Sequence, residues 1–340
     1  MPIAPSPSAP FDVLGLGNAI VDVLSHASEE LVAELGLVKG AMTLVDEERV
    51  EFLYRRMGPA REVSGGSCAN TMAALAALGG RPAYIGRVKD DQLGRVFAHD
   101  IRAAGVTFRS RPASDGPATA RCLIFVTPDA QRTMQTYLGA CVELGPEDVD
   151  PELVAAAGIL YLEGYLWDRP EAKAACRKAA EIAHAHGRQV ALTLSDPFCV
   201  GRWREEFREL VEREVDILFA NEAEITALYE VGSFDEALQA VRRHVRFAAL
   251  TRGPKGSVVV RGEEVHVIDA APVERLVDTT GAGDLYAAGF LHGLTRGLDL
   301  GACGRLGSRC AAAIIQQFGA RAERPLTELI DEPAPGSGRG

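Results

Sequence analysis

The sequence predicts an α/β fold with a mainly parallel sheet and a smaller second sheet. Short apolar or β-branched runs alternate with longer Ala- and Leu-rich runs of helical spacing, a pattern typical of parallel strands connected by helices. Two stretches that are rich in charge and turn signals, 19–65 and 107–142, interrupt this alternation. We therefore expect one large α/β unit, with the two interrupting stretches meeting in a small sheet of their own.

Six runs have the composition of strands buried in a sheet. They are residues 12–17, 158–164, 189–194, 216–220, 247–251 and 257–261. The run VERLV (273–277) is also strand-like, and ARCLIFVTPDAQRTMQTYLG (120–139) predicts a hairpin with its turn at TPDAQ. The expected helices span residues 67–79, 171–187, 221–230, 235–244, 282–296 and 299–317.

Composition excludes several classes of protein. The chain has 340 residues and a formal net charge of -11, which disfavours nucleic acid or an anionic membrane as the main partner. No apolar run is long enough for a transmembrane helix, and the first ten residues lack the features of a signal peptide, so we expect a cytoplasmic protein. The seven cysteines are scattered without a C-x-x-C pair, which indicates reduced thiols rather than disulfides or zinc ligands.

The segment DTTGAGD (278–284) carries the clearest chemistry. It lies directly before an apolar helix, where free backbone N–H groups and the helix dipole bind anions. Gly281, Ala282 and Gly283 leave room for a phosphoryl group, and Asp284 beside them suits a general base that accepts the proton of an attacking hydroxyl. The alternative is a Gly-rich turn in which Asp284 is an ordinary first-turn residue.

Two long motifs then point to a family. DTTGAGDLYAAGF resembles the C-terminal signature of the ribokinase-like (PfkB) carbohydrate and nucleoside kinases, and SGGSCANTMAALAALGG (64–80) resembles their N-terminal signature. The resemblance covers roughly residues 11–325 and implies a three-layer α/β/α core with a small β-sheet lid. It places residues 11–18, 66–106 and 143–330 in the large catalytic domain and 19–65 and 107–142 in the lid, with flexible termini at 1–10 and 331–340.

The resemblance also implies roles at the nucleotide side. Asp284 would be the catalytic base and Gly281, Ala282 and Gly283 the anion hole. In NEAE, Asn221 and Glu224 would place Mg²⁺ through water, although Asn followed by Glu at this spacing is equally a helix capping box. The remaining residues implied for ATP are Thr251, Gly253, Gly256 and Thr279, and GPKG (253–256) taken alone is a good hairpin turn.

At the acceptor side, the resemblance implies that Asp22 binds two vicinal hydroxyls of a sugar, with Asn18, Gly65, Gly66, Ser67 and Asn70 around it. GLGNAIVD (15–22) is a poor dinucleotide fingerprint, because Ile20 takes the place of the third glycine. Arg132, on the second strand of the hairpin, resembles a basic residue brought over the transferring phosphate; an exposed strand charge is the alternative. Leu138, Tyr165, Leu166 and Phe198 would wall a purine pocket, or else belong to the core.

Within the family, the sequence most resembles the adenosine kinases, especially the bacterial branch of the alphaproteobacteria. The resemblance rests on segments 17–48, 132–150, 161–168 and 193–200. It implies phosphorylation of the 5′-hydroxyl of adenosine with Mg²⁺ and ATP, with K⁺ activation left open and either a monomer or a homodimer. A ribokinase- or fructokinase-like sugar kinase and a non-catalytic nucleoside sensor are the alternatives.

Overall fold

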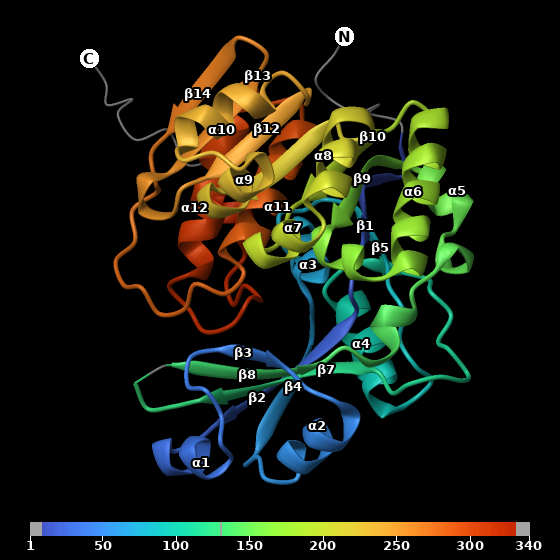
Figure 1. The fold of residues 1–340 in the computed structure, drawn as a ribbon, viewed down its shortest axis with the longest axis vertical. Coiled ribbons are helices and arrows are strands. Elements are labelled where there is room, and N and C mark those ends of the chain that lie inside the picture. Colours follow the sequence, from blue (N-terminus) through green and yellow to red (C-terminus); the bar gives the residue numbers. More distant parts are fainter. Residues whose placement is uncertain (1–8, 130, 331–340) are drawn as a thin grey trace.

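A computed structural model describes residues 9–129 and 131–330, and its largest element is a nine-stranded sheet (Figure 1). The strand order is β14-β13-β12-β11-β10-β9-β1-β5-β6, parallel except for the antiparallel pairs β12–β13 and β13–β14. The strands are β1 (Phe11–Leu16), β5 (Pro82–Ile85), β6 (Thr107–Phe108), β9 (Ala157–Glu163), β10 (Gln189–Thr193), β11 (Ile217–Asn221), β12 (Phe247–Thr251), β13 (Ser257–Arg261) and β14 (Glu264–Ile268).

Helices cover both faces of this sheet, because alternate strand residues point to opposite sides. On β1, Val13 packs into one apolar cluster while Leu14 and Leu16 pack into another. The first cluster includes residues of α3 (Ser67–Ala77), α4 (Gln92–Ala103), α11 (Ala282–Thr295) and α12 (Leu300–Ile314). The second includes residues of α5 (Pro151–Ala155), α6 (Pro170–Ala185), α7 (Pro197–Arg202), α8 (Arg204–Arg213), α9 (Glu222–Tyr229) and α10 (Phe234–Val241).

The smaller sheet has five strands in the order β3-β8-β7-β2-β4 and lies below the large sheet in Figure 1. Its strands are β2 (Ile20–His26), β3 (Met42–Leu44), β4 (Ala60–Gly65), β7 (Ala120–Val126) and β8 (Arg132–Tyr137), and α1 (Glu29–Glu34) and α2 (Glu47–Tyr54) belong to the same part of the chain. The chain enters this sheet through residues 17–19, between β1 and β2, and one return passes through Gly66, between β4 and α3. Residues at these two crossings therefore lie where the two sheets meet.

The structure confirms the six expected strands, the six expected helices and the hairpin, whose strands β7 and β8 are antiparallel. The expected strand at 273–277 is wrong. Instead of joining the sheet, this segment bonds to the end of α12, where Val277 N–H donates to the Ile315 carbonyl at 2.8 Å and Glu274 N–H to Gln316 Oε1 at 2.9 Å. In addition, Thr107–Phe108 pairs with β5 in the large sheet, so the small sheet does not begin at residue 107.

The seven cysteines are all free and buried, as expected for reduced thiols. None of the helices in the described part of the chain combines the length and apolar character needed to cross a bilayer. The expected flexible termini fall almost entirely outside the described residues.

Candidate active site

Asp284 lies in the first turn of α11, a helix that begins without a side-chain cap. Its N-cap is Gly281, whose φ of 80° is a left-handed conformation that favours glycine. A Cβ at Gly281 would also lie 2.8 Å from the Cβ of Ala320. Ala282 N–H donates to the Thr279 carbonyl at 3.2 Å, but no side chain caps the rest of the first turn of this 14-residue helix, and that turn lines a cavity, as in an anion-binding site.

Two side chains of α3 hold the Asp284 carboxylate. Ser67 Oγ donates to Oδ1 at 2.6 Å, and Asn70 Nδ2 donates to Oδ2 at 3.0 Å. Burial raises the pKa of Asp284, and the bonds from Ser67 and Asn70 oppose that rise. The carboxylate is therefore fixed in orientation while its basicity increases, as a general base requires.

One cavity of about 440 Å³ lies over the N-terminus of α11. It brings together most of the residues predicted for the phosphate side: Asn221, Glu224, Thr251, Gly253, Thr279, Gly281, Ala282, Gly283 and Asp284. Ser67, which was predicted for the acceptor side, also lines it. Gly256 is not among the residues that line it. It lies in the turn between β12 and β13 with φ 82°, where a Cβ would strike the backbone carbonyl of Ile268.

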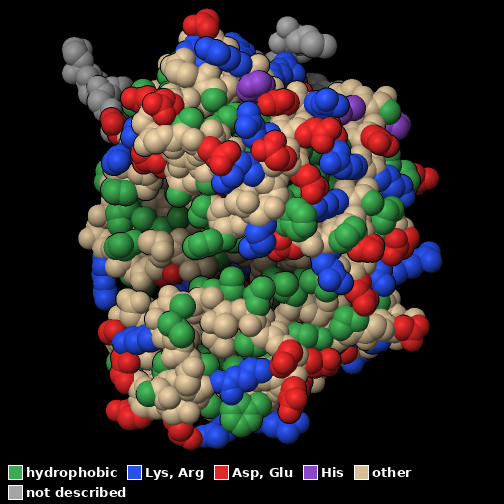
Figure 2. All heavy atoms as spheres, viewed as in Figure 1, with side chains coloured by type: hydrophobic (Ala, Val, Ile, Leu, Met, Phe, Trp, Pro, Cys, Tyr) green, Lys and Arg blue, Asp and Glu red, His purple; other side chains and the backbone are tan. Residues whose placement is uncertain are grey.

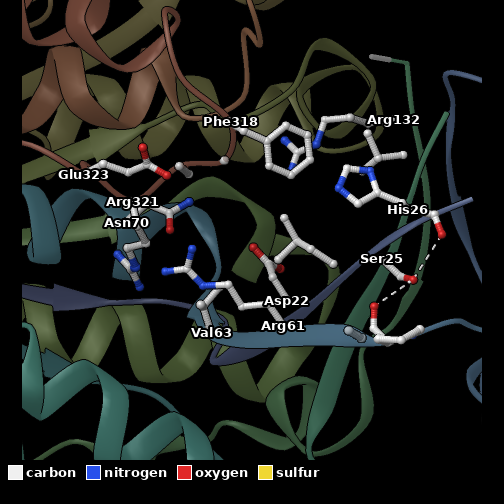
Figure 3. A pocket seen from close by; sticks show the side chains of 16 residues that line it. Asp22, Ser25, His26, Arg61, Val63, Asn70, Arg132, Phe318, Arg321 and Glu323 are labelled. Carbon is white, nitrogen blue, oxygen red and sulfur yellow. Dashed lines mark hydrogen bonds between the residues drawn. The ribbon is translucent and has the colours of Figure 1, made fainter. Parts of the chain in front are cut away.

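A second cavity, of about 390 Å³, lies between the small sheet, Asn70 of α3 and the segment after α12 (Figure 3). Asp22, Leu24 and His26 line it together because alternate residues of β2 share a face. Figure 2 shows the molecule hollowed along the junction between the large unit and the small sheet. Asn70 belongs to both sites, since it lines this cavity and also donates to Asp284.

Asp22 is the acidic side chain of β2 in this cavity, with Gly65 packed against it. A Cβ at Gly65 would lie 2.5 Å from the Asp22 carboxyl carbon, so any larger residue would displace the Asp22 carboxylate. Burial raises the pKa of Asp22 to about 6, while Arg321 and Arg132 act in the opposite direction. The nearby Gly66, with φ 96°, is the N-cap of α3 and lies against the Asn18 carbonyl.

Arg132 connects the small sheet to the loop before α11. Its Nη1 donates to Asp278 Oδ2 at 2.6 Å, and its guanidinium lies 4.9 Å from the ring centroid of Phe318. Asp278 also accepts from the N–H groups of Thr280 and Gly319, both at 3.0 Å. The alternative of an exposed strand charge is therefore wrong, because Arg132 is buried in an ion pair and lines the Asp22 cavity.

Glu163, at the end of β9, is a site residue that the sequence did not single out. Its Oε1 accepts from Asn18 Nδ2 at 2.8 Å and its Oε2 from Cys68 N–H at 2.9 Å. Because Gly66 offers no side-chain cap, this carboxylate satisfies an N–H at the start of the helix that carries Ser67 and Asn70. Glu163 thereby fixes Asn18 and, through α3, the two donors to Asp284.

Burial raises the pKa of Glu163 to about 7, from an ordinary value of 4.5. A group whose pKa is higher in the folded state contributes stability below its unfolded pKa and loses that contribution as the pH rises through the folded value. Unmodified protein should therefore lose unfolding free energy relative to Glu163→Gln as the pH rises from about 5 to about 7, by up to roughly 1.4 kcal/mol per pH unit. Urea unfolding of both proteins across this range measures the difference.

Glu171→Gln, which removes an exposed first-turn carboxylate of α6, is the matched control. A difference between wild type and Glu163→Gln that stays constant from pH 5 to 7 would contradict a raised pKa at Glu163.

None of the four residues expected to wall a purine pocket lines the Asp22 cavity. Leu166 is buried in the core against the α6 side of the sheet, and Phe198 on α7 is 78% exposed. Leu138 lines a separate hollow of the small sheet. The fourth, Tyr165, lines the Asp284 cavity rather than the Asp22 cavity, and its hydroxyl donates to the Ser195 carbonyl at 3.4 Å.

Mg²⁺ fits the Asp284 cavity only with ligands from outside the protein, since the described residues contain no group of three or more His, Cys, Asp or Glu side chains that could hold a metal. Both oxygens of Glu224 already accept from Asn221, one from its N–H at 2.9 Å and one from Nδ2 at 2.6 Å. Each oxygen keeps a second lone pair for a metal-bound water. Asn221 and Glu224 thus form the capping box that the sequence allowed, in a position that also suits water-mediated Mg²⁺ binding.

Comparison with known proteins is consistent with this geometry. Residues 48–326 match the model of the pfkB family carbohydrate kinases. The chain belongs to the pfkB family. It is a kinase, a phosphotransferase, with the ribokinase-like fold expected from its two signatures.

Solved structures and curated relatives of this family cover most of the chain. The structure of adenosine kinase from Sinorhizobium meliloti is 55% identical, covers 94% of this chain and 98% of its own, and has a TM-score of 0.87. The structure of a probable sugar kinase from Rhizobium etli is 51% identical, with 94% and 97% covered and a TM-score of 0.87. The adenosine kinase of Saccharomyces cerevisiae is 28% identical over 92% of this chain and 96% of its own.

Proposed function

We propose that this kinase transfers the γ-phosphoryl group of ATP to the 5′-hydroxyl of adenosine, giving AMP and ADP. The observation that carries the proposal is the Asp22 cavity, which places a carboxylate beside an apolar wall and is lined by Asn70, the residue that donates to Asp284. Similarity to proteins named adenosine kinase supports the same acceptor.

The apolar wall suits a purine. It is lined by Leu24, Val63, Val126 and Phe318, which come from three strands of the small sheet and from the segment after α12. Phe318 stacks on the Arg132 guanidinium, so its ring is held in place. A base packed against this wall would leave the ribose near Asp22, whose two oxygens can accept from both vicinal hydroxyls.

The proposed mechanism uses four parts of the chain. Asp22 and Asn70 orient the ribose, and Asp284 accepts the proton of the 5′-hydroxyl as the phosphoryl group transfers. The backbone N–H groups at the start of α11 stabilise charge on the transferring group. Mg²⁺, held by the ATP phosphates and by waters on Asn221 and Glu224, would supply further charge neutralisation.

The small sheet would act as a lid. Residues of β2, β4, β7 and β8 form one wall of the acceptor cavity, and the Arg132–Asp278 pair ties this sheet to the loop that carries Thr279 and Gly281. A sheet held over the acceptor excludes water, which would otherwise compete for the phosphoryl group.

ADP release from Mg-ATP, with adenosine, inosine, guanosine, ribose and fructose offered separately, tests the proposal. Turnover on adenosine that exceeds turnover on ribose and fructose by tenfold or more is the expected result, because only a purine nucleoside fills both the Asp22 site and the apolar wall. Faster turnover on adenosine than on inosine and guanosine is expected from the similarity to proteins named adenosine kinase. Turnover on a free sugar alone would favour a sugar kinase, the activity for which the Rhizobium etli protein is named. Absence of turnover on all five would overturn the proposal.

A further inference from the structure

Arg321 is a partly buried arginine of the acceptor cavity that the proposed mechanism does not use (Figure 3). It lies in the segment after α12 and donates to two other elements. Its Nε and Nη2 donate to the Ser64 carbonyl at 3.1 and 2.6 Å, and Nη1 donates to the Ala69 carbonyl at 2.9 Å. Nη2 also donates to Ser64 Oγ at 2.9 Å.

These bonds hold the crossing from the small sheet to α3. Ser64 is on β4, directly before Gly65, and Ala69 is in the first turn of α3. Ser64 is held from a second side by Asp100 of α4, whose Oδ2 accepts from its N–H at 2.7 Å and its Oγ at 2.6 Å. The glycines that pack against Asp22 and begin α3 therefore lie between two points fixed by Arg321.

The charge of Arg321 has no ion-pair partner within residues 9–129 and 131–330; the guanidinium hydrogen-bonds only to carbonyls and a hydroxyl. Burial lowers its pKa, which shows that its environment disfavours the charge. The acidic groups that interact with it are Asp100 of α4, Asp22 of β2, Asp284 of α11 and Tyr84 of β5. Arg61, Arg132 and Glu323 line the same cavity, and Glu163 interacts with Asp284 from β9.

A charge withdrawn from water costs free energy unless it is hydrogen-bonded or lies near an opposite charge. Here two of the carboxylates near it, Asp22 and Asp284, are those assigned to acceptor binding and proton transfer. We propose that Arg321 is a positioning residue of phosphoryl transfer, which fixes the β4–α3 crossing and places its positive charge in the same cavity as the Asp22 carboxylate. This inference rests on the proposed roles of these two carboxylates.

Two substitutions separate the charge from the hydrogen bonds. Arg321→Gln keeps a donor for the Ser64 or Ala69 carbonyl but removes the charge, and Arg321→Lys keeps the charge with fewer donors. In Arg321→Gln the acid limb of kcat/KM against pH should move to higher pH, by on the order of one unit, since Asp22 and Asp284 lose an opposite charge. Arg321→Lys should keep the acid limb of the unmodified enzyme and raise KM for the acceptor.

Arg188→Gln is the matched control, because Arg188 also donates to a backbone carbonyl of another element, Ala155, at 3.0 Å, and lines neither cavity. It should leave the pH profile unchanged. The assay uses the acceptor that gives turnover in the panel above, so a failure of adenosine as acceptor overturns the proposed function without deciding on Arg321.

NMR titration tests the role of Arg321 without any need for turnover. The carboxyl ¹³C shifts of labelled aspartate, titrated in unmodified protein and in both variants, should show higher pKa values for Asp22 and Asp284 in Arg321→Gln only. If Arg321→Gln and Arg321→Lys lose thermal stability and activity in parallel with no change in the pH profile or the titrations, Arg321 has only a structural role and the inference is wrong. If Arg321→Gln does not fold, the Arg321→Lys variant decides. For Asp22 and Asp284, pKa values that equal those in the Arg188→Gln control would support a role for the positive charge, and higher pKa values in Arg321→Lys would contradict it.

Discussion

Replacement of Asp284 by asparagine should lower kcat by about 10²- to 10⁴-fold, because asparagine cannot accept the proton of the attacking hydroxyl. KM and affinity for the acceptor should change little, since acceptor binding is assigned to Asp22 and the apolar wall. Steady-state kinetics with Mg-ATP and adenosine measures the first effect, and calorimetric titration with adenosine measures the second.

Asparagine at position 284 should fit without loss of structure. Ser67 Oγ can still donate to the new side-chain oxygen, as it does to Asp284 Oδ1. Asn70 Oδ1 is buried without a hydrogen-bond partner, so rotation of the Asn70 amide would let it accept from the new side-chain nitrogen. Removal of a buried carboxylate should also leave thermal stability equal or higher, which separates loss of chemistry from loss of fold.

Asp235→Asn is the matched control, because Asp235 is likewise an acidic residue in the first turn of a helix but is exposed. It should leave kcat unchanged. If Asp284→Asn retained more than a tenth of the wild-type kcat, Asp284 would not be the base. The anion site at the start of α11 would then serve nucleotide binding alone.

The large sheet could be predicted because its parallel strands are buried on both faces and therefore read as continuous apolar runs. β9, with all seven residues buried, is the clearest example. Apart from the β7–β8 hairpin, the small sheet could be predicted only as a region, because a strand such as β4 (AREVSG) mixes charged and apolar residues. VERLV has the composition of a strand, but the edge beside β13 is already taken by β14.

The residues around Asp284 could be predicted because they lie in two continuous sequence motifs, 278–284 and 64–80. Each motif contains its functional residues at a fixed spacing. Glu163, Phe318 and Arg321 act across long separations: Arg321 bonds to a residue 257 positions away, and no local pattern records such a contact. Glu163 could have been noticed in the sequence, because it is a single carboxylate at the end of an apolar strand. An unpaired charge would be unfavourable there, which indicates a polar partner or a functional site. Leu166 and Phe198 were assigned to the purine pocket because their segments resemble those of the family. The direction in which a side chain points depends on packing, which the sequence of the segment does not specify.

Replacement of Asp22 by alanine should raise KM for adenosine by about 10- to 100-fold with a smaller effect on kcat. Two hydrogen bonds from the ribose hydroxyls to a charged acceptor would be lost, and such bonds contribute about 1.5–3 kcal/mol each before water compensates part of the loss. The same interaction predicts that 2′-deoxyadenosine is a poor substrate of the unmodified enzyme. Initial rates with both nucleosides over a range of concentrations give the four values of kcat/KM.

These four values form a cycle that tests contact rather than general damage. If Asp22 binds the 2′-hydroxyl, the preference for adenosine over 2′-deoxyadenosine should fall to near one in Asp22→Ala, because the variant has nothing left to distinguish the two. Glu62→Ala is the control on β4, since Glu62 alternates with Arg61 and Val63, which line the cavity, and is absent from its lining. An unchanged preference in Asp22→Ala would mean that another group reads the ribose, and Asp22 would then serve only to balance the charges of Arg132 and Arg321.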